Sequence, residues 1–221
     1  MSTLDHSPDP AAPGDALTAA AMTELVGSVL AHELPPIVVA GHPVLRHPAE
    51  EVHGRLDDEL LDRLIATMRR VMHAAPGVGL AAPQIGIPLR IAVLEDRGVP
   101  DEAVAAARSR TPLPFTVMID PHYTAVGDAK DSFYEGCLSV PGYQAVVDRH
   151  HAVEATYTRP DGTRTTEVFE GWPARIVQHE TDHLDGRLYL DRAHVRSLSS
   201  DREHARWAQP TVEDARRGLG F

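Results

Sequence analysis

The stretch Ala174–Leu184 reads ARIVQHETDHL, and it decides both the fold and the chemistry that we predict for this chain. Its residues have helical periodicity, and Pro173 stands where a first helical position is expected. Residues four apart lie on one face of a helix, so His179 and His183 can bind a single metal ion. Glu180, one step round the helix, can reach a water held by the same ion. The spacing therefore predicts a helix that carries a metal site.

A catalytic metal needs a third protein ligand, and three possible sources for it can be tested in the sequence. A histidine at position 189 would complete one class of metalloprotease motif, but Tyr189 stands there. A second class would use a downstream glutamate, either Glu203 or Glu213. The third source is Cys137, because a thiolate is a strong ligand for iron, zinc or nickel. A buried structural cysteine and a nucleophile paired with histidine are the alternatives for this residue.

Composition excludes several classes of protein. The chain has 221 residues and a formal net charge of −11, which argues against a general nucleic-acid binder with a basic face. A single cysteine excludes an intramolecular disulfide and fits a reducing cytosol. The first basic residue is Arg46, which argues against a secretory or mitochondrial leader, and no run of about 18 apolar residues occurs. We expect a cytoplasmic protein without a membrane span or a specific nucleic-acid partner.

Hydrophobic patterning divides the chain into three parts. Residues 1–36 are expected to be a flexible extension with a short helix within Ala16–Leu34, and residues 193–221 a C-terminal arm or helix. Between them, residues 37–192 form the expected catalytic domain, which begins with a long amphipathic helix over Arg55–His73. The runs that predict strands are Leu89–Leu94, Phe115–Ile119, Ala145–Val147, Ala152–Tyr157 and Thr163–Phe169. The expected fold is α+β, with short, mainly antiparallel strands packed around a central HExxH-bearing helix.

Three strings stand in order along the chain: Gly77–Gln84 (GVGLAAPQ), Glu135–Ser139 (EGCLS) and His179–Gly186 (HETDHLDG). They are similar, in the same order, to the motifs GxGLAAxQ, EGCLS and HExDHLxG of the peptide deformylases, a family that this chain therefore resembles. The stretch Gly41–Arg46 also resembles the family's usual opening, so the similarity covers residues 37–192. The resemblance implies hydrolysis of the formyl group from N-formylmethionine at the start of nascent bacterial polypeptides, with release of formate.

The resemblance also implies a metal centre with one divalent ion. Cys137, His179 and His183 would hold the ion, with a water in the fourth position. The family resemblance suggests ferrous iron, Fe2+, as the metal. Zn2+, Ni2+ or Co2+ would fit the same ligands. Glu180 would take a proton from the water and deliver it to the leaving amine.

Three further residues receive roles from the same resemblance. The side-chain amide of Gln84 and the backbone N–H of Leu138 would stabilise the oxyanion of the intermediate. Gly79 would lie against the formyl group and exclude larger acyl groups. Many family members carry an arginine where this chain has Gln144, so contacts to the substrate backbone at that position are not carried over.

Two arginines outside the motifs are candidates for contacts with the substrate. Arg149 and Arg175 could supply cationic contacts, but arginines near strands and helices are usually solvated, and that is the expectation here. Residues 192–221 carry six arginines against four acidic residues, which suggests transient association with the ribosome. A solvated helix that covers part of the core is the alternative for this segment. Alternatives for the whole chain are an HExxH metalloprotease and an inactive relative with a structural metal.

Overall fold

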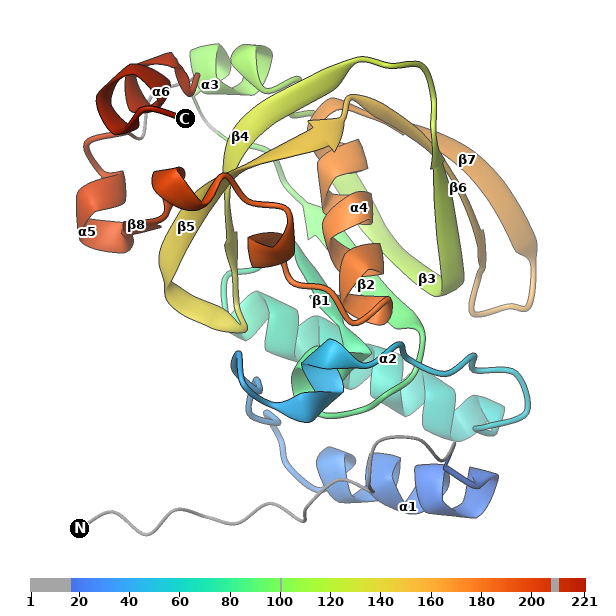
Figure 1. Cartoon of the computed structure of the whole chain (residues 1–221). Helices are drawn as coiled ribbons and strands as arrows, with labels where there is room; N and C mark the ends of the chain where they lie inside the picture. The colour runs from blue at the N-terminus through green and yellow to red at the C-terminus, as the bar shows by residue number, and fades with distance from the viewer. Residues whose placement is uncertain (1–16, 100, 208–210) are drawn as a thin grey trace, which may run out of the picture.

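The computed structural model describes residues 17–99, 101–207 and 211–221 (Figure 1). Of the N-terminal extension expected over residues 1–36, residues 1–16 lie outside this range, and the short helix expected in it lies inside. Helices and antiparallel strands are mixed along the described chain, as the sequence predicts. None of the described helices is both long enough and apolar enough to cross a bilayer.

Six α-helices and eight strands make up the described part of the chain. The helices are α1 (Ala19–Leu30), α2 (Asp58–Ala74), α3 (Glu102–Ala107), α4 (Gly171–Leu184), α5 (Asp201–His204) and α6 (Glu213–Leu219). The strands are β1 (Gly79–Ala81), β2 (Ile91–Asp96), β3 (Leu113–Ala125), β4 (Lys130–Cys137), β5 (Val140–His150), β6 (Ala152–Thr158), β7 (Arg164–Glu170) and β8 (Ser199–Ser200). All strand pairs within the two sheets are antiparallel.

The larger sheet has five strands in the order β1-β2-β3-β6-β7. Its last two strands, which the sequence predicts, form a hairpin, and Asp161 and Gly162 lie in its turn. The backbone N–H of Thr163 donates to the Asp161 carboxylate at 2.9 Å, and Gly162 adopts a φ of +81°, which favours glycine. The turn chemistry therefore fixes the register of this hairpin.

The smaller sheet has three strands in the order β4-β5-β8. Strand β4 ends at Cys137. It was not among the strands predicted from the sequence. Gly136 on β4 faces Gln144 on β5, and Gln144 in turn faces Ser199 on β8. The C-terminal part of the chain therefore completes this sheet beside the cysteine.

Helix α2 is the long amphipathic helix expected in the first half of the chain. The Asp57 carboxylate accepts from the Leu60 N–H at 2.8 Å, which caps the first turn. One face is buried against β1 and β2, while α1 packs on the opposite side of the same cluster. Helix α1 ends at Leu30, four residues earlier than expected, where the chain turns and His32 N–H donates to Val29 O.

Helix α4 contains the HETDH sequence and contacts strands of both sheets. Twelve of its fourteen residues are buried, so it is covered on nearly all sides. In Figure 1 it lies between the β4–β5 pair and strands β3, β6 and β7. The helix begins at Gly171, which makes Pro173 the third helical residue instead of the first. Proline is tolerated there because the first-turn N–H groups have no partner within the helix.

The C-terminal segment packs on the smaller sheet. Tyr134 and Val146 of that sheet share an apolar cluster with Val212 and Ala215, against which Trp207 also packs. This contact fixes α5 and α6 beside the end of β4.

Candidate metal centre

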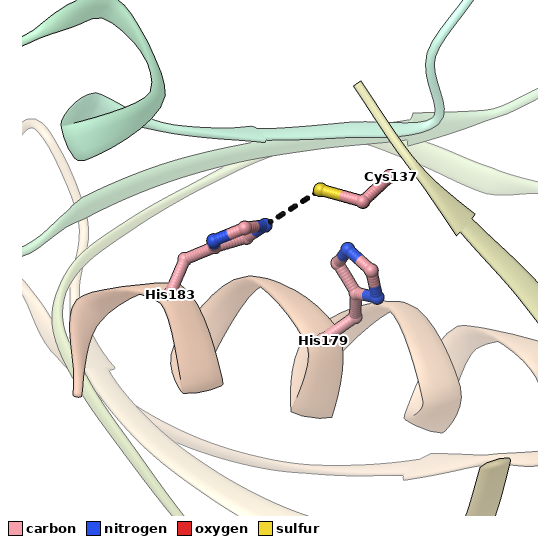
Figure 2. A group of neighbouring side chains, drawn as sticks. All are labelled: Cys137, His179 and His183. Atoms are coloured by element: carbon pink, nitrogen blue, oxygen red, sulfur yellow. Dashed lines mark hydrogen bonds between the residues drawn. The ribbon is translucent and has the colours of Figure 1, made fainter. Parts of the chain in front are cut away.

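Three possible ligand atoms meet between β4 and α4. Those of Cys137, His179 and His183 all lie within 4.8 Å of one another. Figure 2 shows the cysteine at the end of its strand, pointing toward the two imidazoles, which both rise from α4. The Cys137 Sγ lies 3.2 Å from Nε2 of His183. Within the described residues no other group of three such side chains comes this close together.

The donor set suits a small divalent cation. One thiol sulfur and two imidazole nitrogens at these separations would hold one small divalent cation. Burial lowers the pKa of His183, so its ring is neutral and able to ligate. Although burial also opposes protonation of His179, hydrogen bonds to Cys137 and Glu135 raise the pKa of this residue well above its ordinary value. Positive charge is therefore favoured between the thiol and the histidines.

Glu135 orients the first of these histidines. Its Oε2 lies 2.9 Å from Nδ1 of His179, which leaves Nε2 of that ring free to face the cysteine. The same carboxylate accepts from Nε and Nη2 of Arg149 at 2.9 and 3.0 Å, and from Nη1 of Arg175 at 2.6 Å. Burial opposes ionisation of Glu135, but the charges and hydrogen bonds of its partners hold its pKa well below the usual range. The carboxylate is thus ionised and fixed.

The expectation that Arg149 and Arg175 are solvated is wrong. Their exposed fractions are 2% and 3%, because both guanidinium groups pair with Glu135 across the protein interior. Arg149 also pairs with Asp182 on α4, and Asp182 accepts from Nε of Arg192 at 2.8 Å. A buried ionic network therefore surrounds the helix that carries the histidines.

Glu180 lies at the bottom of the same site. Its side chain is buried, and its Oε2 makes no hydrogen bond within the described chain. Burial raises its pKa to about 7, while the nearby His179 acts in the opposite direction. A Cβ at position 79 would overlap Oε1 of Glu180, so only glycine leaves room for this carboxylate.

Gln84 presents its amide toward the cysteine. Its Oε1 accepts from the Ala81 N–H at 2.8 Å, which turns Nε2 toward Cys137 Sγ at 3.6 Å and Ser139 Oγ at 3.4 Å. Leu138 follows the cysteine directly and lines the same cleft. The structure therefore brings all seven residues singled out in the sequence to one site. They are Gly79, Gln84, Cys137, Leu138, His179, Glu180 and His183.

The other sources of a third ligand are not at this site. Tyr189 stacks its ring on that of His179, with centroids 6.3 Å apart, and donates its hydroxyl to Tyr143 O. Glu203 pairs with Arg206 on the outside of the molecule. Glu213 begins α6 in the C-terminal segment.

A cleft of about 470 Å³ opens on the site. One wall contains Gln144, whose Nε2 donates to Oδ1 of Asp201 at 3.3 Å. Asp201 is the first residue of α5, so the C-terminal segment contributes to this wall. The role of Glu135 was missed in the sequence, although its position two residues before the cysteine on one strand face was a usable signal.

Comparison with known proteins agrees with the resemblance. A family model described as polypeptide deformylase matches residues 34–198. Peptide deformylase 3 of Streptomyces avermitilis is 58% identical over 187 residues, which is 84% of each chain. Peptide deformylase 1 of Streptomyces coelicolor is 56% identical over 188 residues, 84% of this chain and 86% of the relative.

Solved structures of similar proteins share the fold. The Met-Ala-Ser-bound crystal structure of a class I type b peptide deformylase from Acinetobacter baumannii has a TM-score of 0.66 and 33% identity, covering 72% of this chain and 98% of that one. The peptide deformylase from Thermotoga maritima has a TM-score of 0.61 and 34% identity, covering 73% and 99%.

Proposed function

The chain belongs to the polypeptide deformylase family, whose members remove the N-formyl group from nascent polypeptides by hydrolysis, and we propose which of its residues carry out that reaction. The observation that carries the proposal is the meeting of Cys137, His179 and His183 beside the buried Glu180. Helix α4 is the central support of this arrangement, because it contributes three of the four side chains.

Cys137, His179 and His183 hold the metal on which this family depends. When bound, a divalent ion lowers the pKa of a coordinated water and so supplies a nucleophile at neutral pH. A thiolate with two imidazoles also accepts zinc, nickel or cobalt, and we take Fe2+ from the family resemblance. The fit of the residues supports the site, since the thiol and the ionised Glu135 both favour a cation there.

Glu180 moves the proton. Its Oε2 has no partner among the described residues and its pKa is raised to about 7, so it can accept a proton from the attacking water. The same carboxyl then donates that proton to the amine that leaves with methionine. A cation beside it lowers this pKa in turn, which keeps the resting carboxylate ionised.

Gln84 and Leu138 stabilise the oxyanion. The Gln84 carbonyl is occupied by Ala81 N–H, so its amide is fixed as a donor toward the reacting atoms. The backbone N–H of Leu138 is the second donor, from the residue next to Cys137. Gly79 keeps space beside Glu180 that suits a formyl group and no larger acyl group.

The substrate is a peptide that begins with formylmethionine. The A. baumannii relative binds Met-Ala-Ser, the deformylated form of such a peptide, and we propose that the cleft of this chain holds the same product. The test is release of formate from formyl-Met-Ala-Ser by the metal-loaded protein. Glu180→Gln should reduce kcat by about 10²- to 10⁴-fold while metal content stays stoichiometric. No release by a metal-loaded wild type would overturn the proposal.

Residues 37–192 form the proposed catalytic domain, with residues 193–221 appended to its smaller sheet. The range of the family match, residues 34–198, supports these boundaries. We also place the protein in the cytoplasm, where nascent chains and reduced thiols occur, and propose transient contact with the ribosome through the basic C-terminal segment. Charge reversal at Arg202 and Arg206 on that segment should weaken ribosome co-sedimentation, and unchanged co-sedimentation would remove this part of the proposal.

A further inference from the structure

Three arginines surround Trp172 in the cleft that opens on the metal centre. Arg108, Arg110 and Arg175 all line this cleft. Their guanidinium carbons lie 5.3, 5.2 and 5.6 Å from the centre of the Trp172 ring. Such a concentration of positive charge is unusual in a chain with a net charge of −11.

Two of the three cations are neutralised within the protein. Arg110 forms two hydrogen bonds with the buried Asp96, at 2.8 and 3.0 Å, and Arg175 pairs with Glu135. Arg108 has no ion pair in the described part of the chain, and its buried Nε makes no hydrogen bond there. Burial and the charges of the other two arginines lower the pKa of Arg108. Among the described residues, the guanidinium of Arg108 is therefore a cation without a counter-charge.

Two more unused donors lie in the same cleft. The indole N–H of Trp172 and the hydroxyl of Tyr134 are buried and have no hydrogen-bond partner in the described chain. The nearby Ser199 hydroxyl donates elsewhere, to Ser197 O at 2.9 Å. A buried donor without a partner is unfavourable unless a ligand or water supplies an acceptor. These unpaired donors add to the positive potential beside the Arg108 guanidinium.

The backbone holds Arg108 in this position. The next residue, Ser109, has a φ of +46°, and its carbonyl accepts a hydrogen bond from the backbone N–H of Trp172 at 3.2 Å. Gly171 lies so close that a Cβ there would overlap Ser109 O. This contact ties the end of α3 to the first turn of α4, so Arg108 is not a freely moving surface side chain.

We infer that Arg108 is a specificity-determining residue that binds a carboxylate in the cleft. The inference rests on the proposed function, because the reaction brings carboxylates to this place in two forms: an acidic side chain of the formylated peptide, or the formate that hydrolysis releases. A guanidinium pairs well with either, since its N–H groups match the two oxygens of a carboxylate.

The peptide source is tested with pairs of substrates. C-terminally amidated tetrapeptides that begin with formylmethionine carry Glu or Gln at one position at a time, from the second to the fourth. In the wild type, kcat/KM for Glu should exceed that for Gln by about tenfold at one position, mainly through KM. Arg108→Gln should bring this ratio to about one, and Arg108→Lys should retain part of it. Arg97→Gln, an exposed residue outside the cleft with the same change of charge, should keep the wild-type ratio.

The formate source is tested by product inhibition on the C-terminally amidated formyl-Met-Ala-Ser, which carries no carboxylate. If formate is the occupant, Arg108→Gln should raise the inhibition constant of formate by about tenfold. The Glu-to-Gln ratios of kcat/KM should then be about one at every position in the wild type and in the variant. If neither the ratio nor formate inhibition responds to Arg108→Gln, the inference is overturned. Calorimetry with the deformylated peptides measures the preference for Glu over Gln as a ratio of dissociation constants, without turnover. Absence of formate release by the wild type would instead contradict the proposed function.

Discussion

Nδ1 of His179 lies 2.9 Å from Oε2 of Glu135, so a carboxylate of the smaller sheet holds an imidazole that rises from α4. Two buried arginines fix the other side of this carboxylate. A hydrogen-bonded carboxylate sets the tautomer of a ligating histidine and raises its basicity. Glu135 is therefore expected to act on the metal through His179.

Glu135→Gln should weaken metal affinity by about 10- to 100-fold, because the histidine loses its anionic partner. Competition with a chelator, using the nickel form, measures this change. Glu95→Gln is the matched control, since Glu95 also pairs with a histidine, His73, but is not among the residues that line the cleft of the metal centre. Equal metal affinities of wild type and Glu135→Gln would contradict the role. The variant should also lose about 3–5 kcal/mol of stability, because two buried arginines lose their counter-charge.

Cys137→Ala should abolish stoichiometric metal binding and reduce activity to about a hundredth of wild type or less. The reason is that one of three ligands disappears while nothing nearby replaces it. Glu203→Gln and Glu213→Gln are the controls and should keep both metal and activity. Metal retained by Cys137→Ala but lost from either glutamate variant would favour the metalloprotease alternative.

The iron form should lose activity in air, whereas the nickel form should keep it. Oxygen oxidises ferrous iron, and a thiol that has lost its metal is open to oxidation itself. Formate release followed over hours in aerobic and anaerobic buffer measures the difference. Equal air stability of the two forms would count against iron as the native metal.

Gly79→Ala should lower kcat by about 100-fold while metal content is unchanged, since the new methyl group would displace the Glu180 carboxylate. Gly27→Ala on α1 is the control, because a Cβ there meets no atom within 4 Å. That control should keep full activity and gain up to about 1 kcal/mol of stability in the helix interior. Full activity of Gly79→Ala would contradict the requirement for glycine beside the Glu180 carboxylate.

The sequence predicts those parts of the site that depend on local spacing. His179 and His183 face one way because they are four residues apart on a helix, and the long helix α2 follows from its apolar stripe. Spacing alone does not identify Cys137 as a ligand, because 42 residues separate it from His179, and its place in the EGCLS motif of the family does. Only the folded chain brings the two elements together.

Strand β4 was missed for a physical reason. Its sequence KDSFYEGC is rich in polar residues and lacks the β-branched run that marks a buried strand. Glu135 is buried there because Arg149 of β5 and Arg175 of α4 supply its counter-charges. Such pairing is a property of three distant segments, so no local window could reveal that these arginines leave water.

Because Cys137 is the only cysteine of the chain and also faces both histidines, all thiol chemistry of this protein belongs to one atom. A thiol-reactive probe would therefore label each molecule at most once, and only when the sulfur is not engaged by a metal. The labelled fraction of a preparation would then count its empty centres directly, without an assay of turnover. The protein carries its own reporter of metal occupancy.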